Sequence, residues 1–230
     1  MTRAFLIKLI VATVFNLVLY AVFLFLPAGT LHWWRAWAFL GIVSFGSVAT
    51  MRFLLPGSAD LLNERLKSPI RKGQPLADKV IALLLITEFI AVEVFIPLDV
   101  FRFHLLGKPN PLVSWGGLAL FGAGWLIITL ACKENPFAAA AVRLQDERHH
   151  RVIDTGVYSV VRHPIYSGAA LYFVGAALWL ESYAAALLMF FPMATLAVRI
   201  FIEEGFLKRN LEGYEAYTKR VRYRLVPFLW

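Results

Sequence analysis

Six apolar segments constrain the fold of this chain more than any other feature. They lie at about residues 5–26, 33–55, 80–100, 112–132, 164–180 and 184–202. A helix needs about 20 apolar residues to cross the hydrocarbon core of a bilayer. Backbone polar groups in lipid must be satisfied within the segment that carries them, so such spans are helical. The sequence therefore predicts an all-α integral membrane protein, built as a multi-span helical bundle.

The last two apolar segments differ from the first four. The segment at 164–180 is short, and only Glu181, Ser182 and Tyr183 separate it from the segment that follows. We expect these two to form a tight helical hairpin. Six spans are the first interpretation, and four spans followed by a re-entrant hairpin are the alternative. The first segment is span-length and lacks a small-residue cleavage site, so we expect no cleaved signal peptide.

The composition agrees with a membrane protein. Of 230 residues, 60% are hydrophobic and 17% are charged, and the mean hydropathy is +0.66. An ordinary soluble domain has about a quarter of its residues charged, so that class is excluded. Cys132 is the single cysteine, which excludes an intramolecular disulfide and a cysteine-based metal site. We expect one membrane domain over 1–230, divided by its chemistry into apolar spans over 1–132 and a more charged unit over 133–230.

Basic residues indicate the orientation. With six spans and both termini on one side, all but three of the 23 Lys and Arg residues lie on that side, and the exceptions are Arg35, Arg102 and Lys108. Lys and Arg accumulate in cytoplasmic loops, so we expect cytoplasmic termini, in the inner membrane if the source is bacterial. The net charge of +8 then reflects orientation, and we expect no nucleic-acid partner.

Other polar residues lie in or beside the spans. Glu88, Glu93 and Asp99 fall in the third span, and we expect buried pairing or solvation for them and leave them out of the site. We interpret the residues that flank the spans as an interfacial belt; they are His32, Trp33, Trp34, Trp37 and His104.

The segment 133–166 is too long and too charged for a simple turn, and loops of this length are usually functional. Pro164 suits the first turn of the following helix, which places Arg162 and His163 at its positive end, where an anionic group can bind. The alternative for both residues is a plain positive-inside anchor. The His149-His150 pair fits a polar loop better than a ligand pair.

A second polar cluster ends the sixth span. Arg199 and Glu203 are four residues apart and share a helix face, and Glu204 follows. Ionisable groups at the membrane boundary indicate a site by default, and a solvated helix end is the alternative. Apolar residues recur at spacings of three and four from Leu207 to Val221, which predicts an amphipathic helix at the interface. No His, Asp and Glu set has a recognisable ligand spacing, so we expect no metal.

Three motifs carry a resemblance to a known family. They read HRVIDTGVYSVVRHPIYSG at 150–168, EEGFL at 203–207 and GYEAYTKRV at 213–221. Together they resemble the isoprenylcysteine carboxyl methyltransferase family, with a tail like that of its prokaryotic members, and more loosely the phospholipid N-methyltransferases. The resemblance covers roughly 133–230, so it implies a methyltransferase-like cofactor-binding unit there. The first hundred residues match only in being spans.

The resemblance implies S-adenosyl-L-methionine as cofactor, in a pocket facing the cytoplasm. The cofactor-binding residues it implies are Gln145, His150, Arg151, Val152, Ile153, Tyr158, His163, Pro164, Ile165, Tyr166, Glu203 and Glu204. It implies a substrate-side catalytic role for Arg199, whose planar guanidinium suits a carboxylate. The implied partner besides the bilayer is a lipophilic or prenylated acceptor, first an isoprenylcysteine-like carboxylate. The oligomeric state stays open.

Other functions remain open at this point. Within the enzyme class, the acceptor is alternatively a phospholipid amine or a small thiol, for which Glu203 or Glu204 would act as base. A non-catalytic transporter or assembly subunit is a second class, for which Glu88, Glu93 and Pro97 are the hint. A third class is a sterol-reductase-like enzyme that uses NADPH.

Overall fold

The fold is helical throughout the part of the chain that the structure describes. The computed structural model describes residues 3–54, 59–68, 70, 74–139 and 141–230, and it contains no strand within those ranges. The long helices are α1 (Arg3–Ala28), α2 (Trp34–Leu54), α4 (Leu76–Leu98), α5 (Pro111–Glu134), α6 (Pro164–Trp179) and α8 (Phe190–Asn210). The shorter ones are α3 (Ala59–Arg65), α7 (Tyr183–Leu188) and α9 (Tyr214–Arg220), with a π-helical turn η1 (Asp99–Phe103) and two 3-10 turns, η2 (Asp146–Arg148) and η3 (Gly156–Ser159).

The predicted multi-span helical bundle is confirmed. Among the described residues, five helical stretches are long and apolar enough to cross a membrane: Phe5–Ala28, Trp34–Phe53, Leu76–Phe103, Pro111–Glu134 and Tyr183–Asn210. The remaining apolar helix, α6, has 16 residues and is about 24 Å long, less than the hydrocarbon thickness of about 30 Å. Many large apolar side chains point outward, as expected for surfaces that face lipid.

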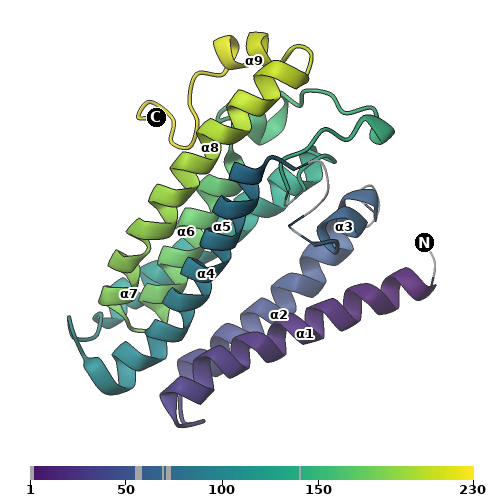
Figure 1. Ribbon diagram of the computed structural model, residues 1–230. Helices are drawn as coiled ribbons and strands as arrows, with labels where there is room; N and C mark the ends of the chain where they lie inside the picture. The colour runs from purple at the N-terminus through teal and green to yellow at the C-terminus, as the bar shows by residue number, and fades with distance from the viewer. Residues whose placement is uncertain (1–2, 55–58, 69, 71–73, 140) are drawn as a thin grey trace.

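The expected hairpin forms where α6 turns back into α7. Helix α6 ends at Trp179, Glu181 adopts a positive φ of 71°, and the side chain of Ser182 caps α7 by accepting a hydrogen bond from the Ala185 amide at 2.9 Å. Met189 joins α7 to α8, which then runs back along the bundle. Figure 1 shows α7 at one end of α8, with α9 and the 135–163 segment at the opposite end, which we call the site end.

Glycines allow α5 and α6 to pack with their backbones in contact. A Cβ at Gly124 of α5 would lie 2.4 Å from the Gly168 carbonyl oxygen, and one at Gly175 of α6 would lie 2.4 Å from the Phe121 amide nitrogen. Small residues at membrane helix interfaces permit this close approach, because van der Waals contact replaces the hydrophobic effect as the driving force. The pair α5 and α6 therefore forms the rigid centre that carries the site segment.

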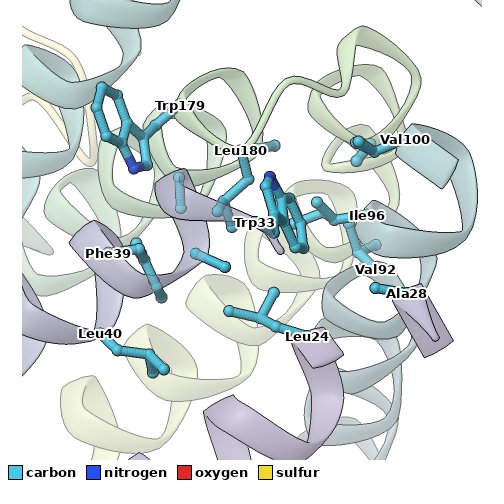
Figure 2. Packing of buried hydrophobic residues seen from close by; sticks show 14 of the residues in the cluster. Leu24, Ala28, Trp33, Phe39, Leu40, Val92, Ile96, Val100, Trp179 and Leu180 are labelled. Carbon is cyan, nitrogen blue, oxygen red and sulfur yellow. The ribbon is translucent and has the colours of Figure 1, made fainter. Parts of the chain in front are cut away.

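The main hydrophobic core joins the N-terminal helices to this centre. Figure 2 shows this core, to which α1 contributes Leu24, α2 Phe39, α4 Val92 and α6 Trp179. Trp33 is also in this core, at 4% exposed, so the belt interpretation is wrong for that residue. Trp34 and Trp37 are exposed, as a belt requires. The difference arises because Trp33 precedes α2 and turns inward onto Phe101.

The acids of the third span have separate surroundings. Asp99 is buried and accepts hydrogen bonds from the Ser182 hydroxyl at 2.6 Å and the Leu105 amide at 3.0 Å. Glu88 accepts one from the Thr195 hydroxyl at 3.0 Å. Glu93 borders a small hollow inside the bundle. Asp99 and Glu88 therefore accept hydrogen bonds from groups within the bundle.

The amphipathic stretch that the sequence predicts after the sixth span is divided. Helix α8 ends at Asn210, Gly213 takes a positive φ of 80°, and α9 begins at Tyr214. The apolar side chains of Leu211, Tyr214, Tyr217 and Val221 form a cluster against Leu144 and Val152 of the 135–163 segment. The apolar face of α9 thus covers the loop of its own chain.

Candidate functional site

The C-terminal segment holds the Arg162-His163 pair in place. The Arg162 amide donates to the Tyr223 carbonyl and the His163 amide to the Arg224 carbonyl, each at 2.9 Å. The Arg162 guanidinium also donates to the carbonyls of Val221 and Arg222 at 2.7 and 2.8 Å. The two residues before α6 are therefore fixed by the chain that follows α9.

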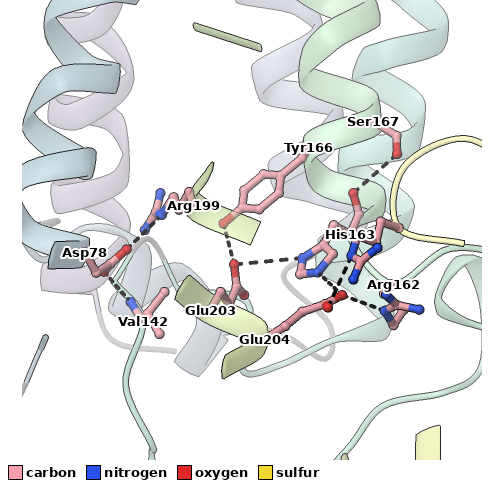
Figure 3. Close-up of polar contacts among 10 residues, drawn as sticks. Asp78, Val142, Arg162, His163, Tyr166, Ser167, Arg199, Glu203 and Glu204 are labelled. Carbon is pink, nitrogen blue, oxygen red and sulfur yellow. Dashed lines mark hydrogen bonds and ion pairs between the residues drawn. The ribbon is translucent and has the colours of Figure 1, made fainter. Parts of the chain in front are cut away.

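The two glutamates of α8 face different partners, as Figure 3 shows. Glu204 is 3% exposed and accepts from Arg162 Nε at 2.6 Å and from Arg224 Nε at 3.2 Å. His163 Nε2 lies 3.3 Å from the same carboxylate. Successive residues on a helix point about 100° apart. Glu204 therefore turns into the protein and serves as the anion of a buried cluster of basic groups.

Glu203 points instead toward α6. Its carboxylate accepts a hydrogen bond from the Tyr166 hydroxyl at 2.7 Å and lies 3.9 Å from His163 Nδ1. The rings of His163 and Tyr166 are stacked, with centroids 5.5 Å apart. The motif that begins α6 and the acids that end α8 therefore meet in one place, as a pocket built from both motifs requires.

Arg199 is held by an acid that the sequence interpretation missed. Asp78, in the first turn of α4, is fully buried and accepts from Arg199 Nε at 3.0 Å and from the Val142 amide at 3.1 Å (Figure 3). Its carboxylate also accepts from Gln74. The available signal was an acid just inside an apolar span, which is costly unless paired. The partner, 121 positions away, was not readable from spacing.

His163, Tyr166, Arg199 and Glu203 border a cavity of about 360 Å³, within the size range of small-molecule sites. At the site end its wall is polar and aromatic and includes His150, Arg151, Tyr158 and Tyr214. Deeper between α4, α6 and α8 the wall is apolar, and we call this part the apolar arm; its lining includes Ala82, Leu85, Ile86, Phe89, Ala169 and Leu196. Tyr166, Arg199 and Glu203 line the cavity where these two parts join.

Most of the site residues that the resemblance implies line this cavity. They are His150, Arg151, Val152, Ile153, Tyr158, His163, Ile165, Tyr166, Arg199 and Glu203. Gln145, Pro164 and Glu204 do not contribute to the wall. Gln145 is 1% exposed; its amide donates to the Phe137 carbonyl at 2.8 Å and its oxygen accepts from Arg148 at 2.6 Å. In this structure the side chain of Gln145 therefore links Phe137 to Arg148 within the segment between α5 and α6.

The wall also contains residues that sequence reasoning did not select. Arg65 of α3 lines the cavity and donates to the Ala138 carbonyl at 3.0 Å. Asn135 and Phe137, just after α5, line it too. None of these had a motif to mark it, and Arg65 of α3 comes close to the site only through the fold.

His150 is the most distinctive polar group in the loop wall. Its ring packs on Phe137, with centroids 4.5 Å apart, and its Nδ1 is buried with no hydrogen-bond partner among the described residues. Burial lowers the pKa of His150, because desolvation penalises the charged imidazolium. A neutral His150 therefore offers this site a nitrogen that a bound molecule can engage as donor or acceptor.

Tyrosines form the remaining polar wall. Burial raises the pKa of Tyr158 and of Tyr214, so both phenols are neutral at physiological pH. The Tyr217 hydroxyl donates to the Tyr158 carbonyl at 2.8 Å, which ties α9 to η3. Within the described ranges, no group of three or more His, Cys, Asp and Glu side chains is arranged to hold a metal ion. The cavity thus combines neutral aromatic groups with the charged Glu203 and Arg199.

Comparison with known proteins gives two kinds of match. Residues 112–213 match the model of a family described as phospholipid methyltransferase. The chain is 27% identical over 159 residues to Protein-S-isoprenylcysteine O-methyltransferase B of Arabidopsis thaliana, covering 64% of this chain and 77% of that protein. It is 32% identical over 129 residues to a Probable protein-S-isoprenylcysteine O-methyltransferase of Oryza sativa subsp. indica, covering 51% of this chain and 62% of the rice protein. The match to the rice protein therefore spans less than two thirds of its length.

Proposed function

We propose that this chain, which over residues 112–213 matches the phospholipid methyltransferase family, transfers a methyl group from S-adenosyl-L-methionine to a lipophilic acceptor held in the membrane. The first candidate acceptor is the carboxylate of an isoprenylcysteine-like molecule. One observation carries the proposal: a single cavity joins a polar, aromatic pocket at the site end to an apolar arm between α4, α6 and α8. A polar cofactor and an apolar acceptor can therefore meet at Tyr166, Arg199 and Glu203.

The polar part of the cavity fits the chemical groups of this cofactor. Its ribose hydroxyls and amino group are donors, for which the Glu203 carboxylate is an acceptor. The buried Nδ1 of His150 lacks a partner among the described residues and is available to a bound polar group. The rings of Tyr158 and Tyr166 offer apolar and π surfaces to adenine or to a sulfonium. When bound, the cofactor supplies a methyl group on a positively charged sulfur.

Arg199 is the group we assign to the acceptor. It lies in the wall at the inner end of the polar pocket, and Asp78 orients its guanidinium through Nε. A guanidinium binds a carboxylate with directional, charge-assisted hydrogen bonds. Arg199 would therefore hold the acceptor oxygen while the hydrocarbon of the acceptor occupies the apolar arm.

Positioning is the contribution that this site makes to the rate. A carboxylate is already ionised at neutral pH, so no side chain has to remove a proton. Holding two reactants in line contributes about 7–11 kcal/mol to lowering a barrier. Glu203 on the cofactor side and Arg199 on the acceptor side are one helical turn apart on α8. A single rigid helix therefore sets the distance between the two binding sites.

The family description favours one second candidate, methylation of a phospholipid amine. An ammonium group must lose a proton before it can accept a methyl group, and Glu203 would receive that proton. Arg199 would then contact the phosphate of the lipid. The two candidates differ in the acceptor and share the cavity.

We propose that the site end faces the cytoplasm, where the soluble cofactor is available. The excess of Lys and Arg on the side of the chain that includes 133–163 supports this orientation. The apolar arm then lies at the depth of the bilayer, so that a lipophilic acceptor reaches it from the membrane.

Two measurements on the purified protein in detergent test the proposal. Calorimetry with S-adenosylhomocysteine and with NADPH should show binding of the first and none of the second. Radiolabelled cofactor should then transfer its methyl group to N-acetyl-S-farnesylcysteine, and phosphatidylethanolamine vesicles test the amine alternative in parallel. Binding of NADPH instead would support a reductase. Binding of neither ligand, with a folded protein, would support a transporter or an assembly subunit.

A further inference from the structure

The apolar arm has a regular wall on α4. Ala82, Leu85, Ile86 and Phe89 follow one another at helical spacing, so one face of α4 lines the arm from near Asp78 inward. Phe89 is the lining residue of α4 farthest from the polar pocket. It lies 11 positions beyond Asp78, which corresponds to about 16 Å along the helix axis.

An aromatic pair ends the arm at this depth. The Phe89 ring is stacked on Phe173 of α6, with centroids 4.2 Å apart and an interplanar angle of 25°. Phe173 does not line the main cavity but lines a second hollow of about 10 Å³, which also borders Glu93 and Tyr20. The stacked pair therefore stands between the arm and this smaller hollow.

We infer that the Phe89–Phe173 pair sets the maximum length of the hydrocarbon chain that the arm accepts. This inference rests on the proposed function and specifies its acceptor. Each CH₂ group that enters the arm strengthens binding about four-fold, as long as space remains. A longer chain has to displace two stacked rings that are packed in the bundle, which offsets that gain.

The opposite wall offers a residue that should shorten the arm. Ala169 of α6 lines the cavity four residues before Phe173, on the same helix face. Its methyl group leaves room that a larger side chain would fill. Phe89→Ala should therefore lengthen the arm and Ala169→Leu should shorten it.

The test compares N-acetylcysteines that carry geranyl, farnesyl and geranylgeranyl chains. For each variant, kcat/KM for the longest chain is divided by kcat/KM for the shortest. We expect Phe89→Ala to raise this ratio about tenfold and Ala169→Leu to lower it about tenfold, each corresponding to two or fewer CH₂ groups. The matched control is Phe95→Ala, which removes a partly buried ring of α4 that lines neither hollow.

Ratios unchanged in both variants, with the wild-type protein active, would overturn the inference and leave the proposed function intact. A wild-type protein that binds S-adenosylhomocysteine but methylates none of the three chains would overturn the prenylcysteine assignment itself. Affinity for S-adenosylhomocysteine verifies that each variant is folded. If Phe89→Ala does not bind it, Phe89→Leu and Ala169→Leu decide the result, and opposite shifts in their ratios are then required.

Discussion

Glu203 and Glu204 are neighbours in the sequence with different roles at the scale of single residues. Glu204 is enclosed by Arg162, His163 and Arg224, whereas Glu203 faces the cavity and Tyr166. The structure therefore separates an acidic pair that the sequence presents as one unit. Glu204 orients the basic groups around the start of α6, and Glu203 is available to a bound molecule.

Substituting the two glutamates one at a time should separate these roles. Glu204→Gln leaves the buried Arg162 without its carboxylate, and breaking a buried ion pair costs about 3–5 kcal/mol of stability. Glu203→Gln should change stability by about 0.5 kcal/mol or less. It should weaken S-adenosylhomocysteine binding about tenfold or more, since a hydrogen bond to a charged group contributes about 1.5–3 kcal/mol. Thermal unfolding and calorimetry measure the two effects.

The reverse result would exchange the assignments of the two acids. If Glu204→Gln keeps its melting temperature but loses the ligand, Glu204 contacts the cofactor directly. Loss of stability in Glu203→Gln would place that residue in the structural cluster.

Asp78 is the second residue whose role depends on its contacts. Asp78→Asn keeps an oxygen for the Val142 amide but removes the charge that orients Arg199. Misplacing a catalytic group by about 1 Å can reduce the rate about 10²-fold, so we expect kcat to fall by about that factor. Affinity for S-adenosylhomocysteine should stay near the wild-type value, because Glu203 and His150 are unchanged.

The control for Asp78 is Asp60→Asn, which changes an exposed acid in the first turn of α3. It should leave both kcat and ligand affinity unaltered. An equal loss of kcat and ligand affinity in Asp78→Asn would contradict a specific effect on Arg199. It would mean that Asp78 supports the structure of the whole cavity.

At the scale of elements, the short α6 depends on α5. Helix α6 carries the site residue Tyr166 in its first turn and is too short to span the hydrocarbon core alone. Its glycines Gly168 and Gly175 meet the backbone of α5, so the two helices act as one support. Any residue that separates these backbones should move Tyr166 relative to α8.

Gly124→Ala tests this packing. The added methyl group would lie 2.4 Å from the Gly168 carbonyl oxygen, and overpacking of this kind costs about 1–3 kcal/mol. Gly122→Ala is the matched control on the same helix, because its methyl group meets nothing within 4 Å. The control should be neutral or slightly stabilising, since alanine favours helices by up to about 1 kcal/mol over glycine. Equal melting temperatures for the two variants would contradict backbone contact between α5 and α6.

At the scale of the whole molecule, the bundle has two chemically different ends. The site end carries Glu203, Arg162 and the loop 135–163, while Arg35, Glu181 and Lys108 form ion pairs at the opposite end. The bundle therefore separates the cavity opening from the α6–α7 turn by the length of α8.

Cysteine labelling tests the proposed orientation. Cys132 is buried, and replacing it with serine gives a background without native thiols. Lys108→Cys and Lys219→Cys introduce single thiols at exposed positions, one at each end of the bundle. An impermeant maleimide should label Lys108→Cys in intact cells and Lys219→Cys only after the membrane is opened. The reverse pattern would place the cavity outside the cytoplasm.

The apolar helices and their order followed from the sequence alone, but five of the described stretches are long enough to be spans rather than the six first expected, because the segment at 164–180 forms the short helix α6. In lipid each span must satisfy its own backbone hydrogen bonds, so an apolar run of sufficient length specifies a helix locally. The turn at Glu181 and the start of α6 at Pro164 followed from equally local signals, a short polar interruption and a proline suited to a first turn.

The contacts between distant segments were decided only by the tertiary structure. Asp78 meets Arg199, Phe89 stacks on Phe173, and the residues after α9 bind the backbone of Arg162. The break at Gly213 belongs here as well, because Leu211 and Tyr214 turn onto the loop of their own chain. Helix formation depends on neighbours along the chain, whereas side-chain partners depend on how the finished helices pack, and the periodicity of one helix does not specify that packing.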